Sequence, residues 1–197
     1  MDANKMLRKL YDTTITLAEH PKALWILAIV SFAESSFFPI PPDVLLLPMV
    51  LAAPTKAWRY ALVCSVSSIL GGIFGYIIGA YFFDIVGQPI VDFYHLQSQF
   101  ESFSALYNDH GAAIVAVAGF SPIPYKVFTI ASGVTNLDIA TFIIASALSR
   151  SARFFLVAAL PWKFGEPIRE FIENHLGKLT LIFSILLVGA YLLLKYI

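Results

Sequence analysis

Prolines and an aspartate interrupt an apolar run that starts at Ala23 and resumes at Val44, within the stretch SSFFPIPPDVLLLP (35–48). Neither apolar piece is long enough to cross a membrane alone, since a spanning helix needs about 20 residues. Each proline lacks a backbone N–H and fixes φ, so a helix breaks here. Irregular backbone at membrane depth is tolerated only where protein or a wet cavity surrounds it. The stretch therefore predicts a re-entrant hairpin whose break faces a cavity.

Composition indicates that the chain belongs in a membrane. Of its 197 residues, 58% are hydrophobic and only 13% are charged, whereas soluble domains are about half apolar and a quarter charged. The formal net charge is zero, so no excess of basic charge favours nucleic acid, and no nucleic-acid partner is expected. We expect an all-α integral membrane protein.

A second stretch, GFSPIPYKVFTIASG (119–133), repeats the Pro-Ile-Pro core. Pro39 aligns with Pro122 at an offset of 83 (122 − 39 = 83), and the same offset aligns Asp43 with Lys126. Short apolar pieces flank the second break as they flank the first. A second re-entrant hairpin is therefore predicted.

The same offset places Thr55 on Asp138, and both residues are predicted to cap the spanning helices that follow. Asn136 is a further cap candidate. The chain thus reads as a duplicated unit, in which each hairpin is followed by a transmembrane helix, with one more transmembrane helix near the C-terminus. The expected spanning segments are 57–83, 139–160 and 179–194.

Three regions follow from these segments. Residues 1–21 are predicted to form an N-terminal amphipathic helix, residues 22–165 a transmembrane core with both hairpins, and residues 166–197 a polar segment with the last transmembrane helix.

The distribution of lysine and arginine predicts the orientation. Segment 84–110 contains neither residue, whereas segments 1–22 and 161–178 and the linker with Lys56 and Arg59 are basic. Cytoplasmic loops carry the excess of Lys and Arg, so 84–110 is expected outside and the others inside. The two hairpins then enter from opposite sides. This is an inverted repeat, an architecture typical of secondary transporters.

The motifs FSPIPYKVFTIASG (120–133) and SRSARFF (149–155) resemble the DedA family, also called the SNARE-associated or VTT superfamily. The resemblance covers roughly residues 22–160. It implies a small membrane protein with two opposed re-entrant hairpins in a bacterial cytoplasmic (inner) membrane. Family members are implicated in moving lipids between leaflets, including undecaprenyl phosphate and phosphatidylethanolamine, and in membrane-potential and pH tolerance.

The family pattern has acidic residues around the first hairpin, which Glu34 and Asp43 match, and basic residues in the second half, which Arg150 and Arg153 match. The widespread form of the second hairpin carries Arg and Pro-Gly where Pro124-Tyr125-Lys126 stands here. The chain is therefore similar to a divergent bacterial subfamily.

Four residues of the second half are predicted to bind substrate: Tyr125, Lys126, Arg150 and Arg153. Arg150 lies in the middle of an apolar span, where a charge costs at least about 2.5 kcal/mol. Arg153 is three residues further along and projects from nearly the same face. Two guanidinium groups on one face suit a phosphate, although Arg153 in the alternative snorkels towards the cytoplasm. Lys126 either lies buried near this pair or stays among the outer head groups.

Glu34 and Asp43 flank the first break and are the candidates for proton coupling, because burial disfavours the charged form of a carboxyl group. The alternative is structural, with Asp43 capping the helix that begins at Val44 and Glu34 pairing with an arginine. Of the two, Glu34 is the stronger coupling candidate.

Prolines and one glycine are predicted to form the hairpin breaks: Pro39, Pro41, Pro42, Pro122, Pro124 and Gly133. A separate ridge of Gly71, Gly75 and Gly79 permits close helix packing, either in a homo-oligomer or within one chain. No histidine pair has metal-ligand spacing, so neither a metal nor another cofactor is expected.

The leading functional hypothesis is a transporter that moves a lipid phosphate or phospholipid between leaflets, with an anionic head group and a proton or cation as partners. The alternatives are a small-ion or proton antiporter on the same scaffold and a non-transporting membrane-homeostasis protein. An enzyme is not expected, because Ser121 and Ser132 have no histidine nearby in the sequence to act as base.

Overall fold

The computed structural model describes residues 22–38, 40–121 and 123–165. The amphipathic helix expected in 1–21, the last span expected in 179–194, and Pro39 and Pro122 lie outside these ranges. The described part is all-helical, as predicted, and contains no strand. Its helices are α2 (Ala23–Ser36), α3 (Asp43–Ala52), α4 (Ala57–Phe82), α5 (Gln88–Phe93), α6 (Gln97–Asp109), α7 (Gly111–Phe120), α8 (Tyr125–Val134) and α9 (Ile139–Phe164), with a 3-10 turn η1 (Pro54–Lys56) and a π-helical turn η2 (Phe83–Gly87).

Among the described residues, two helices are long and apolar enough to cross a membrane. One is the continuous helical stretch Pro54–Phe93, which contains α4, and the other is α9. At about 1.5 Å per residue, the 26 residues of α9 extend about 39 Å. In contrast, α2, α3 and α7 have 14, 10 and 10 residues and are too short to span alone. The predicted alternation of short limbs and long helices is therefore observed.

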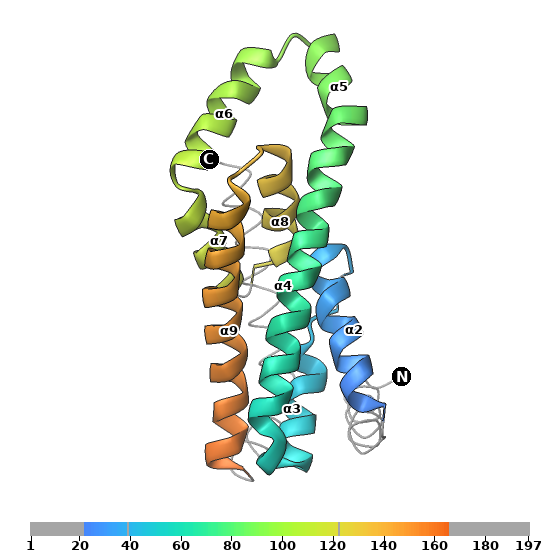
Figure 1. Cartoon of the computed structure of the whole chain (residues 1–197), viewed down its shortest axis with the longest axis vertical. Coiled ribbons are helices and arrows are strands. Elements are labelled where there is room, and N and C mark those ends of the chain that lie inside the picture. The colour runs from blue at the N-terminus through green and yellow to red at the C-terminus, as the bar shows by residue number, and fades with distance from the viewer. Residues whose placement is uncertain (1–21, 39, 122, 166–197) are drawn as a thin grey trace, which may run out of the picture.

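The two long helices pack against each other along the molecule (Figure 1). In Figure 1, α2 runs upward from the lower end and α3 runs back down, whereas α7 runs downward and α8 runs back up. The second limb of each pair packs on the long helix of the other half, since α8 contacts α4 and α3 contacts α9. The two breaks, between α2 and α3 and between α7 and α8, thus lie partway along the long helices and not at the ends of the bundle (Figure 1).

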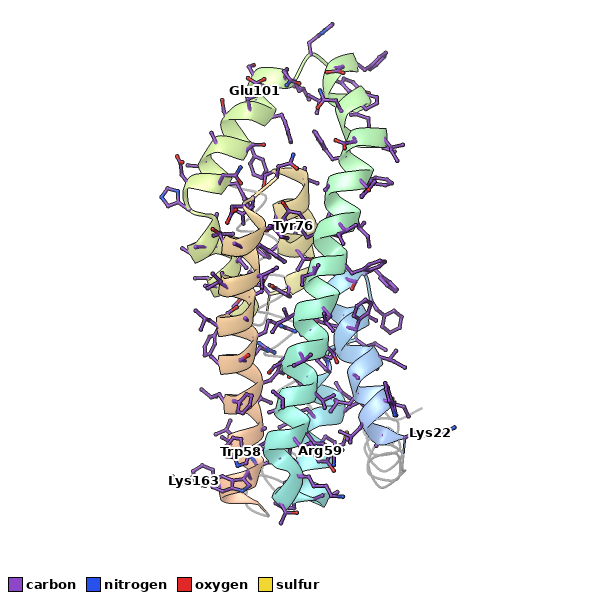
Figure 2. All side chains as sticks on the ribbon, in the orientation of Figure 1. Lys22, Trp58, Arg59, Tyr76, Glu101 and Lys163 are labelled. Carbon is purple, nitrogen blue, oxygen red and sulfur yellow. The ribbon has the colours of Figure 1, made fainter. Side chains whose placement is uncertain are left out.

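The two ends of the molecule differ in charge. Figure 2 shows Lys22, Trp58, Arg59 and Lys163 at one end and Glu101 at the other. Trp58 packs on Trp162, with 5.2 Å between ring centroids, and tryptophan is enriched at membrane interfaces. The basic end therefore has the composition of a cytoplasmic interface.

The glycine ridge is used within the chain. A Cβ atom on Gly71 would collide with the carbonyl oxygen of Phe32 in α2, and one on Gly79 would collide with that of Ile130 in α8. Only glycine lets these backbones approach so closely. The ridge is thus covered by α2 and α8, and the alternative that it holds a dimer together is wrong.

Gly133 has a similar role, and its prediction as a break residue is wrong. It lies inside α8, where a Cβ atom would collide with the carbonyl oxygen of Tyr76 in α4. Among the described residues, the second break is formed by Ser121, Ile123 and Pro124.

The caps were predicted in part. Asp138 is the N-cap of α9, and its Oδ2 accepts a hydrogen bond of 2.7 Å from the backbone N–H of Thr141. This bond stabilises the carboxylate and lowers the pKa of Asp138. Thr55 is not a cap, because it lies in the 3-10 turn and α4 starts after Lys56 with no side-chain cap. Asn136 lies before the cap in a left-handed conformation, with φ of 51°.

Candidate functional site

The candidate site lies where one face of α9 meets the two breaks. Arg150 and Arg153 are three residues apart and therefore project together. Arg150 reaches Glu34 near the end of α2, and Arg153 reaches Asp43 at the start of α3. The structure thus brings together four of the residues that the sequence singled out, although they come from opposite halves of the chain.

Arg150 is almost completely enclosed, with 4% of its side chain exposed. Its Nη2 donates to Glu34 Oε2 at 2.8 Å, its Nε donates to Ser68 Oγ of α4 at 2.6 Å, and its Nη1 donates to the carbonyl of Gly119 at 3.4 Å. A buried guanidinium is tolerated only when it is paired and hydrogen-bonded. These contacts from α2, α4 and α7 meet that requirement.

Two serine hydroxyl groups connect Arg150 to Glu34 by a second route, so that the hydrogen bonds form a closed ring. Ser68 Oγ and Ser35 Oγ are 2.7 Å apart, and Ser35 Oγ donates to Glu34 Oε2 at 3.2 Å. Since Ser35 gives its single hydroxyl proton to Glu34, Ser68 is the donor between the two serines. Every member of the ring then has a partner, which is the condition for a stable buried polar network.

Two aromatic rings hold the Arg150 guanidinium. Its central carbon lies 4.7 Å from the ring centroid of Tyr125 and 4.6 Å from that of Phe154. Tyr125 is itself buried and donates from its hydroxyl to Ser146 Oγ of α9 at 2.5 Å. Cation–π contacts stabilise a desolvated guanidinium. The ring of Tyr125, predicted to bind substrate, is thus directed at Arg150.

Arg153 joins the two breaks directly. Its Nη2 lies 2.5 Å from Asp43 Oδ2. Its Nη1 donates to the carbonyls of Phe120 and Ser121 at 3.1 and 2.9 Å. Asp43 is the first residue of α3 and forms no side-chain cap, so the alternative that it caps this helix is wrong.

The carbonyl contacts have a simple cause. Helix α7 ends at Phe120, and its last carbonyls have no partner within the helix. A cation is favoured at this end because the helix dipole is negative there. The break that ends α7 thereby creates acceptors for both arginines, through Gly119, Phe120 and Ser121.

Lys126 is the second residue of α8 and is half-buried. Within the described ranges, its side chain forms no ion pair and no hydrogen bond. A cation at a helix N-terminus faces the positive end of the dipole, so an anion there is favoured. The structure leaves Lys126 outside the arginine–carboxylate contacts.

The site is balanced in charge. Two guanidinium groups face two carboxylates, so the largely enclosed cluster of Glu34, Asp43, Arg150 and Arg153 is formally neutral when all four are ionised. Because an uncompensated buried charge is costly, each arginine and its carboxylate compensate one another.

Sequence reasoning missed Ser35, Ser68 and Phe154. Hydroxyl groups in apolar segments were the available signal, in the strings ESS (34–36) and CSVSS (64–68). Phenylalanine in an apolar span gives no comparable signal, because most such residues face lipid or the core.

Comparison with known proteins places the chain in a family. A protein from Haemophilus influenzae is 40% identical over 195 residues, covering 97% of this chain and 99% of the relative, and is described only as uncharacterized. A protein from Histophilus somni, also described as uncharacterized, is 40% identical over 195 residues, covering 97% of this chain and 100% of the relative. No solved structure matches the chain. The family model of the VTT domain matches residues 40–162, which contain three of the four charged residues of the site, so the chain belongs to the VTT-domain family, also called the DedA or SNARE-associated family.

Proposed function

We propose that this chain is a transporter, not an enzyme, that moves a lipid phosphate or phospholipid between the leaflets of a bacterial inner membrane. The observation that carries the proposal is the neutral cluster of Glu34–Arg150 and Asp43–Arg153 at the two breaks. In this proposal α2–α3 and α7–α8 are re-entrant hairpins of an inverted repeat, and the cluster lies near the membrane midplane.

The arginines supply the head-group site. A guanidinium binds two phosphate oxygens with its planar fork, and each guanidinium here is held by a carboxylate that a phosphate can replace. Protonation of Glu34 or Asp43 leaves the cluster with one net positive charge. Binding of an anionic head group then restores neutrality. A proton gradient thus drives binding on one side and release on the other. Lys126, near the second break, adds a further cation for an anionic head group.

Apolar side chains at both breaks suit a lipid substrate. Phe37, Phe38 and Ile40 at the first break and Phe120 at the second are exposed, as are apolar side chains along α4 and α9. A lipid requires a lateral route with its acyl chains kept in the bilayer. The apolar rims of the breaks are consistent with head-group entry from the side.

The test is transfer by the purified full-length chain in liposomes. Fluorescent phosphatidate carries a phosphate head group, and fluorescent phosphatidylcholine is the matched control with no net charge. We expect dithionite quenching to report faster movement of phosphatidate than in protein-free liposomes, and a further increase with a proton gradient. Movement of neither lipid above the protein-free rate would contradict the proposal. Proton flux without lipid movement, detected with a pH-sensitive dye, would favour the antiporter.

A further inference from the structure

The two ion pairs of the cluster are enclosed to different degrees. Arg150 has a ring within 5 Å on two sides, and its side chain is 4% exposed. Its partner Glu34 also accepts from Ser35 and is 14% exposed. Arg150 is also held by the hydroxyl of Ser68 and by the two aromatic contacts. The Arg150–Glu34 pair is therefore the more enclosed of the two.

The Arg153–Asp43 pair is more open. The side chains of Arg153 and Asp43 are 18% and 20% exposed. The described aromatic rings make no cation–π contact with Arg153, whose other bonds go to the carbonyls of Phe120 and Ser121. These bonds keep the guanidinium in place when the Asp43 carboxylate no longer contacts it. The pair can therefore open while Arg153 stays at the break.

Asp43 also has an unsatisfied oxygen. Among the described residues, its Oδ1 atom is buried and has no hydrogen-bond partner. A buried oxygen without a partner is costly while it carries charge, and a proton on Oδ1 removes that charge. Glu34 has no buried, unpartnered oxygen of this kind within the same ranges, and its Oε2 is shared by Arg150 and Ser35.

We propose that Asp43, rather than Glu34, is the carboxyl group that takes up the proton, and that Arg153 is the guanidinium that then receives the phosphate of the head group. The inference rests on the proposed function and assigns its exchange step to one pair. A proton from the aqueous phase binds Asp43. A phosphate oxygen of the head group then forms an ion pair with the guanidinium of Arg153. Glu34 and Arg150 stay paired throughout and hold the breaks together.

The charged and titratable groups that face Asp43 come from two helices. Arg153 and Arg150 approach from α9, and Cys64 from α4 lies within electrostatic range. Helix α7 has no titratable side chain along its length. An anion at Arg153 takes the place of the Asp43 carboxylate there, and a proton on Asp43 then keeps the cluster neutral. Proton and anion therefore bind together.

Carbodiimide labelling tests which carboxyl group is protonated. Dicyclohexylcarbodiimide reacts with protonated carboxyl groups in apolar surroundings, and the adduct is located by mass spectrometry of the full-length chain in liposomes. As the pH falls, we expect more label on Asp43 than on Glu34. Adding phosphatidate to the liposomes should raise the label on Asp43 at a given pH. Label on Glu34 in equal or greater amount, or on neither at any pH, would overturn the proposal.

Variants separate this inference from the proposed function. Asp43→Asn should make phosphatidate transfer insensitive to pH, whereas Glu34→Gln should keep the pH dependence even if its rate falls. Loss of pH dependence in Glu34→Gln alone would overturn the assignment to Asp43. If the wild type labels at Asp43 but transfers no lipid, the lipid-transport proposal fails while proton binding at Asp43 stands.

Discussion

Arg150 of α9 donates from its Nε to Ser68 Oγ of α4 across 2.6 Å, and this contact joins the two long helices. The residues are 82 positions apart (150 − 68 = 82), close to the offset of 83 between the two Pro-Ile-Pro cores. In the proposed inverted repeat, a contact between nearly equivalent positions would lie next to the pseudo-two-fold axis. The candidate site would then face both halves of the chain.

The Arg150–Glu34 pair should behave as a buried pair in a double-mutant cycle. Arg150→Met should lower the free energy of unfolding by about 3–5 kcal/mol, because Glu34 loses the charge that compensates it. Adding Glu34→Gln should recover part of this loss, because no carboxylate is then left unpaired. Thermal unfolding of the purified protein in detergent measures both changes. Additive losses in the double variant would contradict the pairing.

Arg150→Lys should be damaging although it keeps the charge. Lysine lacks the planar fork and the Nε–H, so it cannot reach Glu34 and Ser68 together. We expect loss of most lipid transfer and less folded protein in the membrane. Arg59→Lys is the matched control, since Arg59 is exposed on α4. Membrane abundance by immunoblot and transfer in the same liposomes would distinguish the variants, and equal behaviour would argue against a role for the guanidinium.

Alanine substitution at two neighbouring glycines of α4 should have different effects on stability. Gly71→Ala should destabilise the protein by about 1–3 kcal/mol, because the new methyl group collides with backbone of α2 that cannot rotate away. At Gly72 the nearest atom to an added Cβ is 3.4 Å away, in the side chain of Tyr125. Gly72→Ala should therefore be neutral or stabilising, since alanine is the better helix former. Fluorescence-detected size-exclusion chromatography after heating measures the difference.

Asp138 should contribute stability that disappears in acid. Its pKa is lowered in the folded protein, first by the backbone N–H of Thr141 and then by the hydroxyl of Thr141. The contribution is fully present above the unfolded pKa of about 3.9 and is lost as the pH falls through the lower folded pKa. Asp138→Ala should lower the melting temperature at pH 7 and lessen the further fall below pH 4.

Thr55→Ala is the control for the cap, because Thr55 is exposed and caps no helix. It should leave the melting temperature unchanged at both pH values. A fall equal to that of Asp138→Ala would mean that the cap does not cause the effect.

Cysteine labelling should report the orientation. In a Cys64→Ser background, Ser98→Cys on α6 should react with an impermeant maleimide from outside intact cells. Lys22→Cys and Lys56→Cys, which flank the first pair of limbs, should react only after the membrane is opened. Opposite reactivity of these two positions would mean that α2 and α3 form one kinked spanning helix, and the inverted repeat would be wrong.

The sequence was sufficient for most features that depend on local chemistry. Prolines end helices wherever they remove an N–H, so the two breaks and the short limbs were predicted within a few residues. Long apolar runs give spanning helices because nothing else satisfies the backbone in lipid. Asp138 was recognised as a cap because capping is a contact over three residues. Charges in apolar segments identified Glu34, Asp43, Arg150 and Arg153 before their partners were known.

Predictions from the local sequence were wrong where a residue type is compatible with two structural roles. Thr55 has a capping side chain, but the chain enters α4 through a 3-10 turn that does not use it. Helix α9 continues through Pro161 to Phe164, beyond the predicted end at residue 160, although the proline removes one N–H from the helix. Gly133 reads as a helix breaker, yet the close approach of α4 requires it inside α8.

Only the tertiary structure decided which charges meet. Glu34 and Arg150 are 116 residues apart, and Asp43 and Arg153 are 110 apart. A sequence shows that such charges need partners but not which ones, because the choice depends on how α2 and α3 pack across α4 and α9. The same packing places α2 and α8 over the glycine ridge. It also encloses the Arg150–Glu34 pair more than the Arg153–Asp43 pair. Helix breaks and spans follow from properties of single residues, whereas pairing and burial follow from the geometry of the whole bundle.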